Sequence, residues 1–76
     1  MIHELDTVVL AHSIAEYSLN AGDVGAVVHV YKDNTAYEVE FVTGEGETIA
    51  ILTLKPSDIR AMRRREILHV RKFAPA

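Results

Sequence analysis

The sequence predicts a mainly β protein, specifically a small five-stranded SH3-like barrel with a short helical turn before the last strand. Turn-forming residues recur about every ten positions, which leaves room for short strands rather than for helices. Between these turns, apolar and polar residues alternate as they do in strands with one buried face. Because a chain of 76 residues has few other means of protecting exposed sheet edges, we expect the sheet to close on itself.

The predicted first strand is followed by a long loop and a glycine-rich turn. Residues 7–10 form an apolar, β-branched run that is typical of a strand. Residues 11–23 form a polar loop, and we expect its few apolar side chains to pack back onto the barrel. Gly22 and Gly25, with Asp23 between them, predict a tight turn and then a bend where two backbone segments approach closely.

The next two predicted strands form a hairpin. Residues 26–31 are expected to place their even-numbered side chains on one face and their odd-numbered side chains on the other. Residues 32–35 predict the turn, because Asp33 and Asn34 tolerate left-handed backbone conformations. In residues 37–41, Tyr, Val and Phe alternate with Glu, which predicts one core face and one solvated face.

The last two predicted strands follow a second turn at residues 43–47. Residues 48–54 are rich in Ile, Leu and Thr and predict the fourth strand. Residues 56–59 predict a helical turn, because proline fits its first position and serine and aspartate can cap it. Residues 66–73 alternate again and predict the closing strand, with a short helix across residues 58–69 as the alternative.

Length and composition predict one folded domain over residues 1–76, in which residues 63–76 are either a basic extension or the closing strand. Hydrophobic residues make up 49% of the chain and charged residues 25%, which is too apolar for a disordered protein. The chain has no cysteine, which excludes disulfides and favours the cytoplasm. It has no long apolar run and no signal-like start, so we expect no membrane span. Residues 74–76 are expected to fray.

Charge is distributed unevenly along the chain. Residues 1–47 carry nine acidic side chains and one basic, whereas residues 48–76 carry seven basic and two acidic. Such a chain can pair its two halves internally, or it can present potential of one sign to a partner.

The sequence resembles a known class of barrels at its glycine turn. Residues 22–28 resemble the glycine-centred strand of KOW-type and related SH3-like barrels. Residues 3–62 resemble a bacterial family of short barrel proteins that carries only a domain-of-unknown-function label, and residues 63–73 are longer than is usual there. The resemblance implies a stand-alone domain without a known active site, and a role suggestive of toxin–antitoxin or immunity pairs. The blocks that carry it are residues 4–10, 22–31, 37–41 and 54–60.

No catalytic, metal-binding or cofactor-binding motif is recognisable. No two of the four histidines lie closer than nine positions, so the short-spaced pair that is typical of a metal site is missing. Glu38 and Glu40 share a strand face, which we interpret as a solvated surface rather than an acid–base pair. The serines lack a nucleophile motif, and the Gly22 turn lacks the lysine of a phosphate-binding loop. We expect no enzyme activity, no metal and no cofactor.

We predict that the chain binds a protein partner, as an antitoxin or immunity-like neutraliser does. An acidic strand face or a basic tail would oppose a complementary surface, with aromatic side chains as anchors. The first alternative is a KOW-like nucleic-acid-binding domain that uses the C-terminal arginines. The second is a self-assembling structural subunit. The candidate binding residues are Glu38, Glu40, Arg63, Arg64, Arg65, Tyr31 and Phe73.

Overall fold

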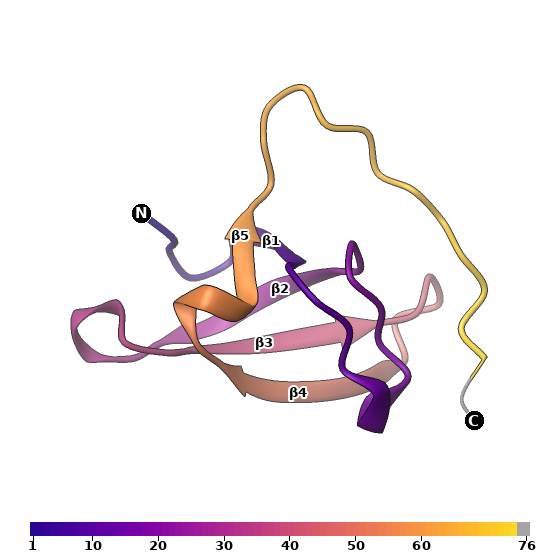
Figure 1. Cartoon of the computed structure of the whole chain (residues 1–76), viewed down its shortest axis with the longest axis horizontal. Coiled ribbons are helices and arrows are strands. Elements are labelled where there is room, and N and C mark those ends of the chain that lie inside the picture. The colour runs from indigo at the N-terminus through magenta and orange to yellow at the C-terminus, as the bar shows by residue number, and fades with distance from the viewer. Residues whose placement is uncertain (75–76) are drawn as a thin grey trace.

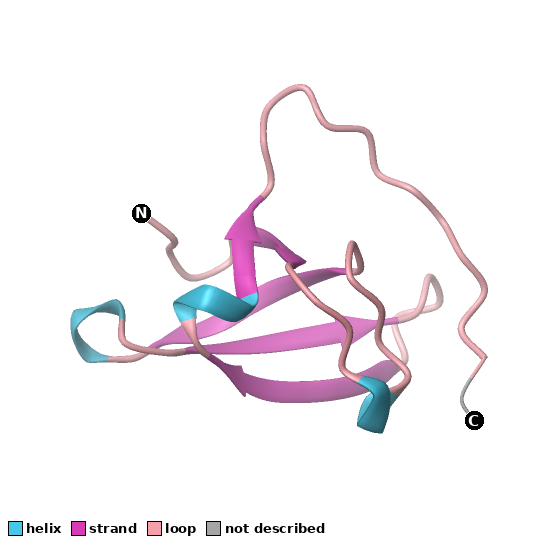
Figure 2. Cartoon of the chain, viewed as in Figure 1, coloured by secondary structure: helices cyan, strands magenta, loops and turns pink. Residues whose placement is uncertain are grey.

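Five antiparallel strands form one curled sheet in the computed structural model, which describes residues 1–74 (Figure 1). The strands are β1 (Thr7–Leu10), β2 (Val24–Val30), β3 (Tyr37–Val42), β4 (Thr48–Leu54) and β5 (Ile59–Ala61), in the spatial order β4-β3-β2-β1-β5. The helical elements of the described residues are short 3₁₀ turns (Figure 2), namely η1 (Ala15–Tyr17), η2 (Lys32–Asn34) and η3 (Pro56–Asp58). The prediction of a mainly β protein with five strands is confirmed.

Hydrogen bonds do not close this sheet within residues 1–74, although the sequence predicts closure. β4 and β5 are its two edges, and η3 connects them along the chain. β5 is only three residues long, and all of its pairing is with β1. A strand this short has no length left over with which to pair along β4.

The hydrophobic core lies on the inner face of the sheet. β3 contributes every second residue to it, so the predicted alternation of Tyr, Val and Phe with Glu is confirmed. Leu19 comes from the loop after β1 and is 2% exposed, as expected for a loop side chain that packs back onto the sheet. The core side chains are Val8, Leu10, Leu19, Val27, Tyr37, Val39, Phe41, Leu54 and Ile59.

The glycine turn is confirmed at both of its glycines. Gly22 has a φ of +94°, a backbone conformation that residues other than glycine rarely adopt. At Gly25, a Cβ atom would lie 2.6 Å from Cγ1 of Val39 and 2.9 Å from Cε1 of Phe41. Glycine is therefore needed at this position so that β3 side chains can pack directly on the backbone of β2.

A β-bulge interrupts β2, so the alternation of side chains in residues 26–31 differs from the predicted one. The register against β3 shifts between Val27 and His29. The extra residue leaves Val28 and His29 both exposed, whereas Val27 is fully buried and Val30 turns back toward the core. The predicted odd–even pattern therefore holds through Val28 and is wrong from His29 onward.

The turn between β2 and β3 adopts the predicted left-handed conformation. Asp33 and Asn34 have φ angles of 59° and 53°. The Asn34 side chain donates hydrogen bonds to the carbonyl oxygen of Ile2 (3.1 Å) and to the hydroxyl oxygen of Tyr37 (3.2 Å). This asparagine therefore ties the N-terminal residues to the hairpin.

The C-terminal residues differ most from the sequence prediction. The fifth strand is Ile59–Ala61, which directly follows η3, and residues 66–73 form neither the expected strand nor the alternative helix. Because β5 occupies the edge of β1 opposite β2, no edge of β1 is left for a later strand. Residues 62–74, which we term the C-terminal segment, instead run as an extended chain around the outside of the sheet (Figure 1). Residues 75 and 76, for which fraying is expected, lie outside the described residues.

Candidate functional site

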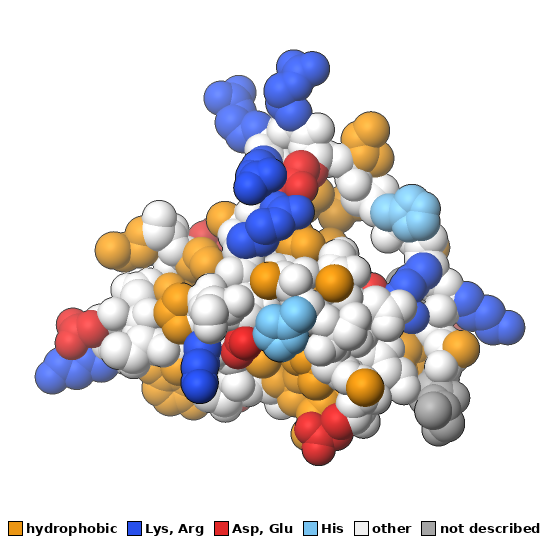
Figure 3. All heavy atoms as spheres, viewed as in Figure 1, with side chains coloured by type: hydrophobic (Ala, Val, Ile, Leu, Met, Phe, Trp, Pro, Cys, Tyr) orange, Lys and Arg blue, Asp and Glu red, His pale blue; other side chains and the backbone are white. Residues whose placement is uncertain are grey.

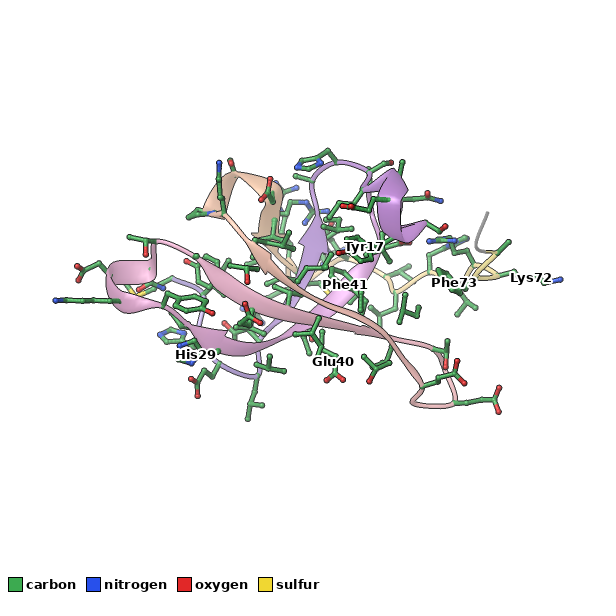
Figure 4. The ribbon with its side chains drawn as sticks, turned by 90° about the horizontal axis from the view of Figure 1, so that it is seen from below. Tyr17, His29, Glu40, Phe41, Lys72 and Phe73 are labelled. Carbon is green, nitrogen blue, oxygen red and sulfur yellow. The ribbon has the colours of Figure 1, made fainter. Side chains whose placement is uncertain are left out.

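The sheet face opposite the core, here termed the outer face, carries the two predicted acidic residues. Glu38 and Glu40 are each half-buried and project from β3 away from the core. Figure 4 shows Glu40 and His29 on one side of the sheet and Phe41 on the other. Thr48 on β4 donates a hydrogen bond to Oε2 of Glu40 over 2.8 Å. Neighbouring hydroxyl groups therefore hold the carboxylates at fixed positions on this face.

Tyr31 joins the same cluster. Its hydroxyl donates to Oε1 of Glu38 over 3.1 Å, and the Thr53 hydroxyl donates to the same oxygen. The Tyr31 ring also meets the ring of His29 edge to face, with centroids 4.7 Å apart. Two of the predicted binding residues, Tyr31 and Glu38, are thus brought into direct contact.

Apolar side chains surround these carboxylates on the outer face. Val28, Val42 and Ile51 are 43%, 48% and 53% exposed, and they come from β2, β3 and β4 respectively. Glu40 is the register partner of Ile51, so charge and apolar surface are adjacent. Charged and exposed apolar side chains therefore lie side by side on this face.

The three consecutive arginines lie elsewhere, on a turn of the C-terminal segment. The guanidinium of Arg60 binds both carboxylate oxygens of Glu66, at 2.8 and 2.7 Å, and the backbone N–H of Arg63 also donates to Glu66. The Arg60 guanidinium, followed by the Arg63 N–H, lowers the pKa of Glu66 to about 2. The turn that this carboxylate closes exposes Arg63, Arg64 and Arg65, and none of these side chains has an ion pair within residues 1–74. Lys and Arg side chains gather over this part of the chain in Figure 3.

A second ion pair clamps the far end of the C-terminal segment. Arg71 Nε donates to Oδ1 of Asp23 over 2.7 Å, and Arg71 Nη2 donates to Oδ2 of Asp23 and to the carbonyl oxygen of Ser18. Hydrogen bonding from Arg71 holds the pKa of the Asp23 carboxyl below its ordinary value. The expectation that the basic and acidic halves of the chain pair internally is confirmed for one C-terminal arginine, Arg71.

Between the clamp and the sheet lies a groove with a volume of about 540 Å³. Phe73, a predicted binding residue, lines it and is only half exposed. The sheet side of the groove is formed by Leu19, Val24, Phe41, Val42 and Ile49.

His12 and Asp58 form a further pair. Nε2 of His12 lies 2.7 Å from Oδ1 of Asp58, and this contact joins the loop after β1 to η3. The two residues are 46 positions apart, and no local pattern in the sequence marks either of them as a pairing residue.

Neither a metal-binding group nor a membrane-spanning helix is found within residues 1–74. No three His, Asp or Glu side chains in that range come together as a metal-binding group. No helix in it is long and apolar enough to cross a bilayer.

Comparison with known protein families finds a match for this chain. The model of the domain of unknown function DUF4926 matches residues 4–61, which is most of the chain. The chain belongs to the DUF4926 family. No curated protein and no solved structure matches it significantly. The DUF4926 match contains all five strands and Asp23, whereas Glu66 and Arg71 lie beyond it. The sheet is therefore the DUF4926 domain, and both clamps join it to additional chain.

The predicted site residues accordingly occupy three places around the DUF4926 sheet. Tyr31, Glu38 and Glu40 share the outer face, the three arginines lie on the C-terminal turn, and Phe73 lies at the groove. Asp23, predicted only as a turn residue, is also an arginine receptor. The turn role is confirmed by the N–H of Asn20, which donates to the Asp23 carboxylate over 2.7 Å.

Proposed function

We propose that this DUF4926 domain is a non-catalytic protein-interaction module that binds a partner protein on its outer face. The observation that supports this most directly is the combination of Glu38 and Glu40 with the exposed side chains of Val28, Val42 and Ile51. The surface fits a partner whose basic side chains are flanked by apolar ones. Hydrogen bonds from Thr and Tyr fix the carboxylates before binding, which reduces the entropy lost on association.

The finer architecture that we propose is an SH3-like barrel. It is supported by the interior place of β1, which pairs with both β2 and β5, and by the single 3₁₀ turn that precedes β5. We propose that the module works in a bacterial cytoplasm. Neutralising a partner, as antitoxins and immunity proteins do, is one form of this function.

The test is affinity capture from the native cells with a matched pair of variants. Glu38→Gln/Glu40→Gln removes the charges of Glu38 and Glu40 and retains the side-chain shape and one oxygen acceptor on each side chain. Glu16→Gln/Glu45→Gln removes the same charge at exposed positions on η1 and on the turn before β4. We expect the wild type and the control to capture the same partner, and the outer-face variant to lose it. Equal capture by all three proteins would contradict the proposal.

A second candidate, nucleic-acid binding, is favoured by one observation. Arg63, Arg64 and Arg65 are exposed on a closed turn, where they could meet phosphates. Binding to single-stranded RNA over a salt series tests it, with Arg63→Ala/Arg64→Ala/Arg65→Ala as the variant. This candidate predicts affinity that falls as salt rises and is lost in the triple variant. No binding at low salt would exclude it.

A further inference from the structure

Asp23 is built as a receptor for an arginine. The backbone N–H of Asn20 fixes Oδ2, and the guanidinium of Arg71 meets both carboxylate oxygens at 2.7 and 2.5 Å. The carbonyl oxygen of Ser18 accepts a further hydrogen bond from the same guanidinium at 3.0 Å. A bidentate carboxylate with an added carbonyl acceptor suits the planar fork of arginine and does not suit the single ammonium of lysine.

The groove next to Asp23 is apolar on its sheet side. Leu19, Phe41 and Ile49 belong to the core or pack against it, and they extend the core to the surface at this end of the sheet. With the C-terminal segment as its other wall, the groove has a volume of about 540 Å³, which is in the range of sites that hold a small ligand or a few side chains. An arginine receptor therefore stands at the rim of an apolar groove.

The C-terminal segment satisfies the polar part of this site and covers only part of the apolar groove. Phe73 lines the groove and is half exposed. Leu68 and Val70 also line it but remain 63% and 91% exposed, and Ile67 is 91% exposed. The segment passes over the groove and leaves most of its own apolar side chains in solvent (Figure 4 shows Phe73 beside Lys72 at this end of the chain). The apolar part of the site is thus only partly covered.

We infer that this groove binds an extended peptide of a partner protein, which carries an arginine with a bulky apolar side chain within three positions of it. The arginine would replace Arg71 on Asp23, and the apolar side chain would enter the groove between Phe41 and Ile49. The C-terminal segment of the chain itself acts as a weak internal competitor. Because this site depends on Asp23, Phe41 and Ile49 and shares only Val42 with the outer face, it goes beyond the proposed function, and either can fail without the other.

The charge of the site favours a peptide over other occupants. A carboxylate beside an apolar groove, such as Asp23 once Arg71 is displaced, attracts a cationic side chain and repels a phosphate or a nucleic-acid backbone. Asp23 lies in the part of the chain that the family model covers, and Arg71 does not. The receptor therefore belongs to the domain, while the arginine comes from a separable segment.

The experiment is an NMR titration of the full-length chain with a synthetic peptide that copies residues 67–73. Two proteins are compared, the wild type and Arg71→Ala, in which the internal arginine no longer competes. We expect the peptide to shift the amide signals of Val24, Phe41 and Ile49 in both proteins. We expect it to bind Arg71→Ala about tenfold more tightly, the change that corresponds to about 1.4 kcal/mol.

A control peptide with alanine in place of its arginine distinguishes recognition from nonspecific apolar binding. We expect this control to bind Arg71→Ala at least about tenfold more weakly than the arginine peptide does. Equal binding of the two peptides, or no saturable shift with either, would overturn the inference. A wild-type dimer that Arg71→Ala abolishes would also overturn it, because the occupant would then be the segment of a second copy.

Discussion

The imidazole of His12 lies between two acceptors, of which the closer is the carboxylate of Asp58. Nε2 faces Oδ1 of Asp58 at 2.7 Å, and Nδ1 faces the carbonyl oxygen of Ser13 at 3.2 Å. Both ring nitrogens can donate at once only when the ring is protonated. The hydrogen bond to Asp58 therefore raises the pKa of His12 above 6.5, and the same contact lowers the pKa of Asp58 below 3.8.

This pair predicts that stability depends on pH in a defined window. The contribution of His12 is fully present below pH 6.5, its unfolded pKa, and is lost as pH rises through the raised folded pKa. The contribution of Asp58 is present above pH 3.8 and is lost as pH falls through its lowered folded pKa. We expect the urea midpoint to be higher at about pH 5.5 than at about pH 8.5.

Variants at two histidines check the source of this dependence. His12→Ala should reduce the difference between the two midpoints. His69→Ala, a change at another exposed histidine, should leave the difference intact. If His12→Ala and the wild type gave the same difference, the pair would not be its source.

Gly25→Ala is predicted to destabilise the fold. The new Cβ would meet the side chains of Val39 and Phe41 at distances well below van der Waals contact. Overpacking of this kind reduces the free energy of unfolding by about 1–3 kcal/mol. Gly44→Ala is the control, because a Cβ there meets nothing within 4 Å, and it should change stability by less than about 0.5 kcal/mol. Urea denaturation measures both, and similar values for the two variants would contradict the packing at Gly25.

The two faces of β2 predict opposite outcomes for two adjacent valines. Val27→Ala removes a fully buried side chain and should reduce the free energy of unfolding by about 2 kcal/mol. Val28→Ala changes a side chain that is 43% exposed and should reduce it by less than about 0.5 kcal/mol. If Val28→Ala were the more harmful change in thermal or urea denaturation, β2 would have a different register.

The Arg60–Glu66 contact is predicted to hold the turn at residues 63–66 in a fixed conformation. Glu66→Gln removes the negative charge that binds the guanidinium of Arg60 and the backbone N–H of Arg63. We expect faster amide hydrogen exchange at residues 63–66 in this variant, with unchanged exchange in β3. Because the pKa of Glu66 is lowered to about 2, the wild-type turn should keep its protection down to about pH 3. Unchanged exchange at the turn in Glu66→Gln would mean that the carboxylate does not hold it.

Local patterns predicted the parts of the fold that local chemistry decides. The alternation in residues 37–41, the left-handed turn at Asp33 and Asn34, and the close approach at Gly25 each follow from one residue type and its neighbours. The bulge was not predictable, because both valines around it suit either face of a strand.

Competition between segments explains the main error. Residues 66–73 alternate like a strand, but Ile59–Ala61, which comes earlier in the sequence, already pairs with the free edge of β1. The pairs His12–Asp58 and Asp23–Arg71 span 46 and 48 positions, so only the folded chain brings them together. The acidic surface could be predicted because all of it lies on one short strand, whereas the arginine receptor could not.

The measurement closest to the central claim places a photo-crosslinking amino acid at Ile51, on the outer face beside Glu40. A second protein carries the same amino acid at Ser57, an exposed residue of η3. Irradiation in the native cells should join a partner protein covalently to position 51 and not to position 57. Efficient crosslinking at position 57 with none at position 51 would contradict recognition through the outer face.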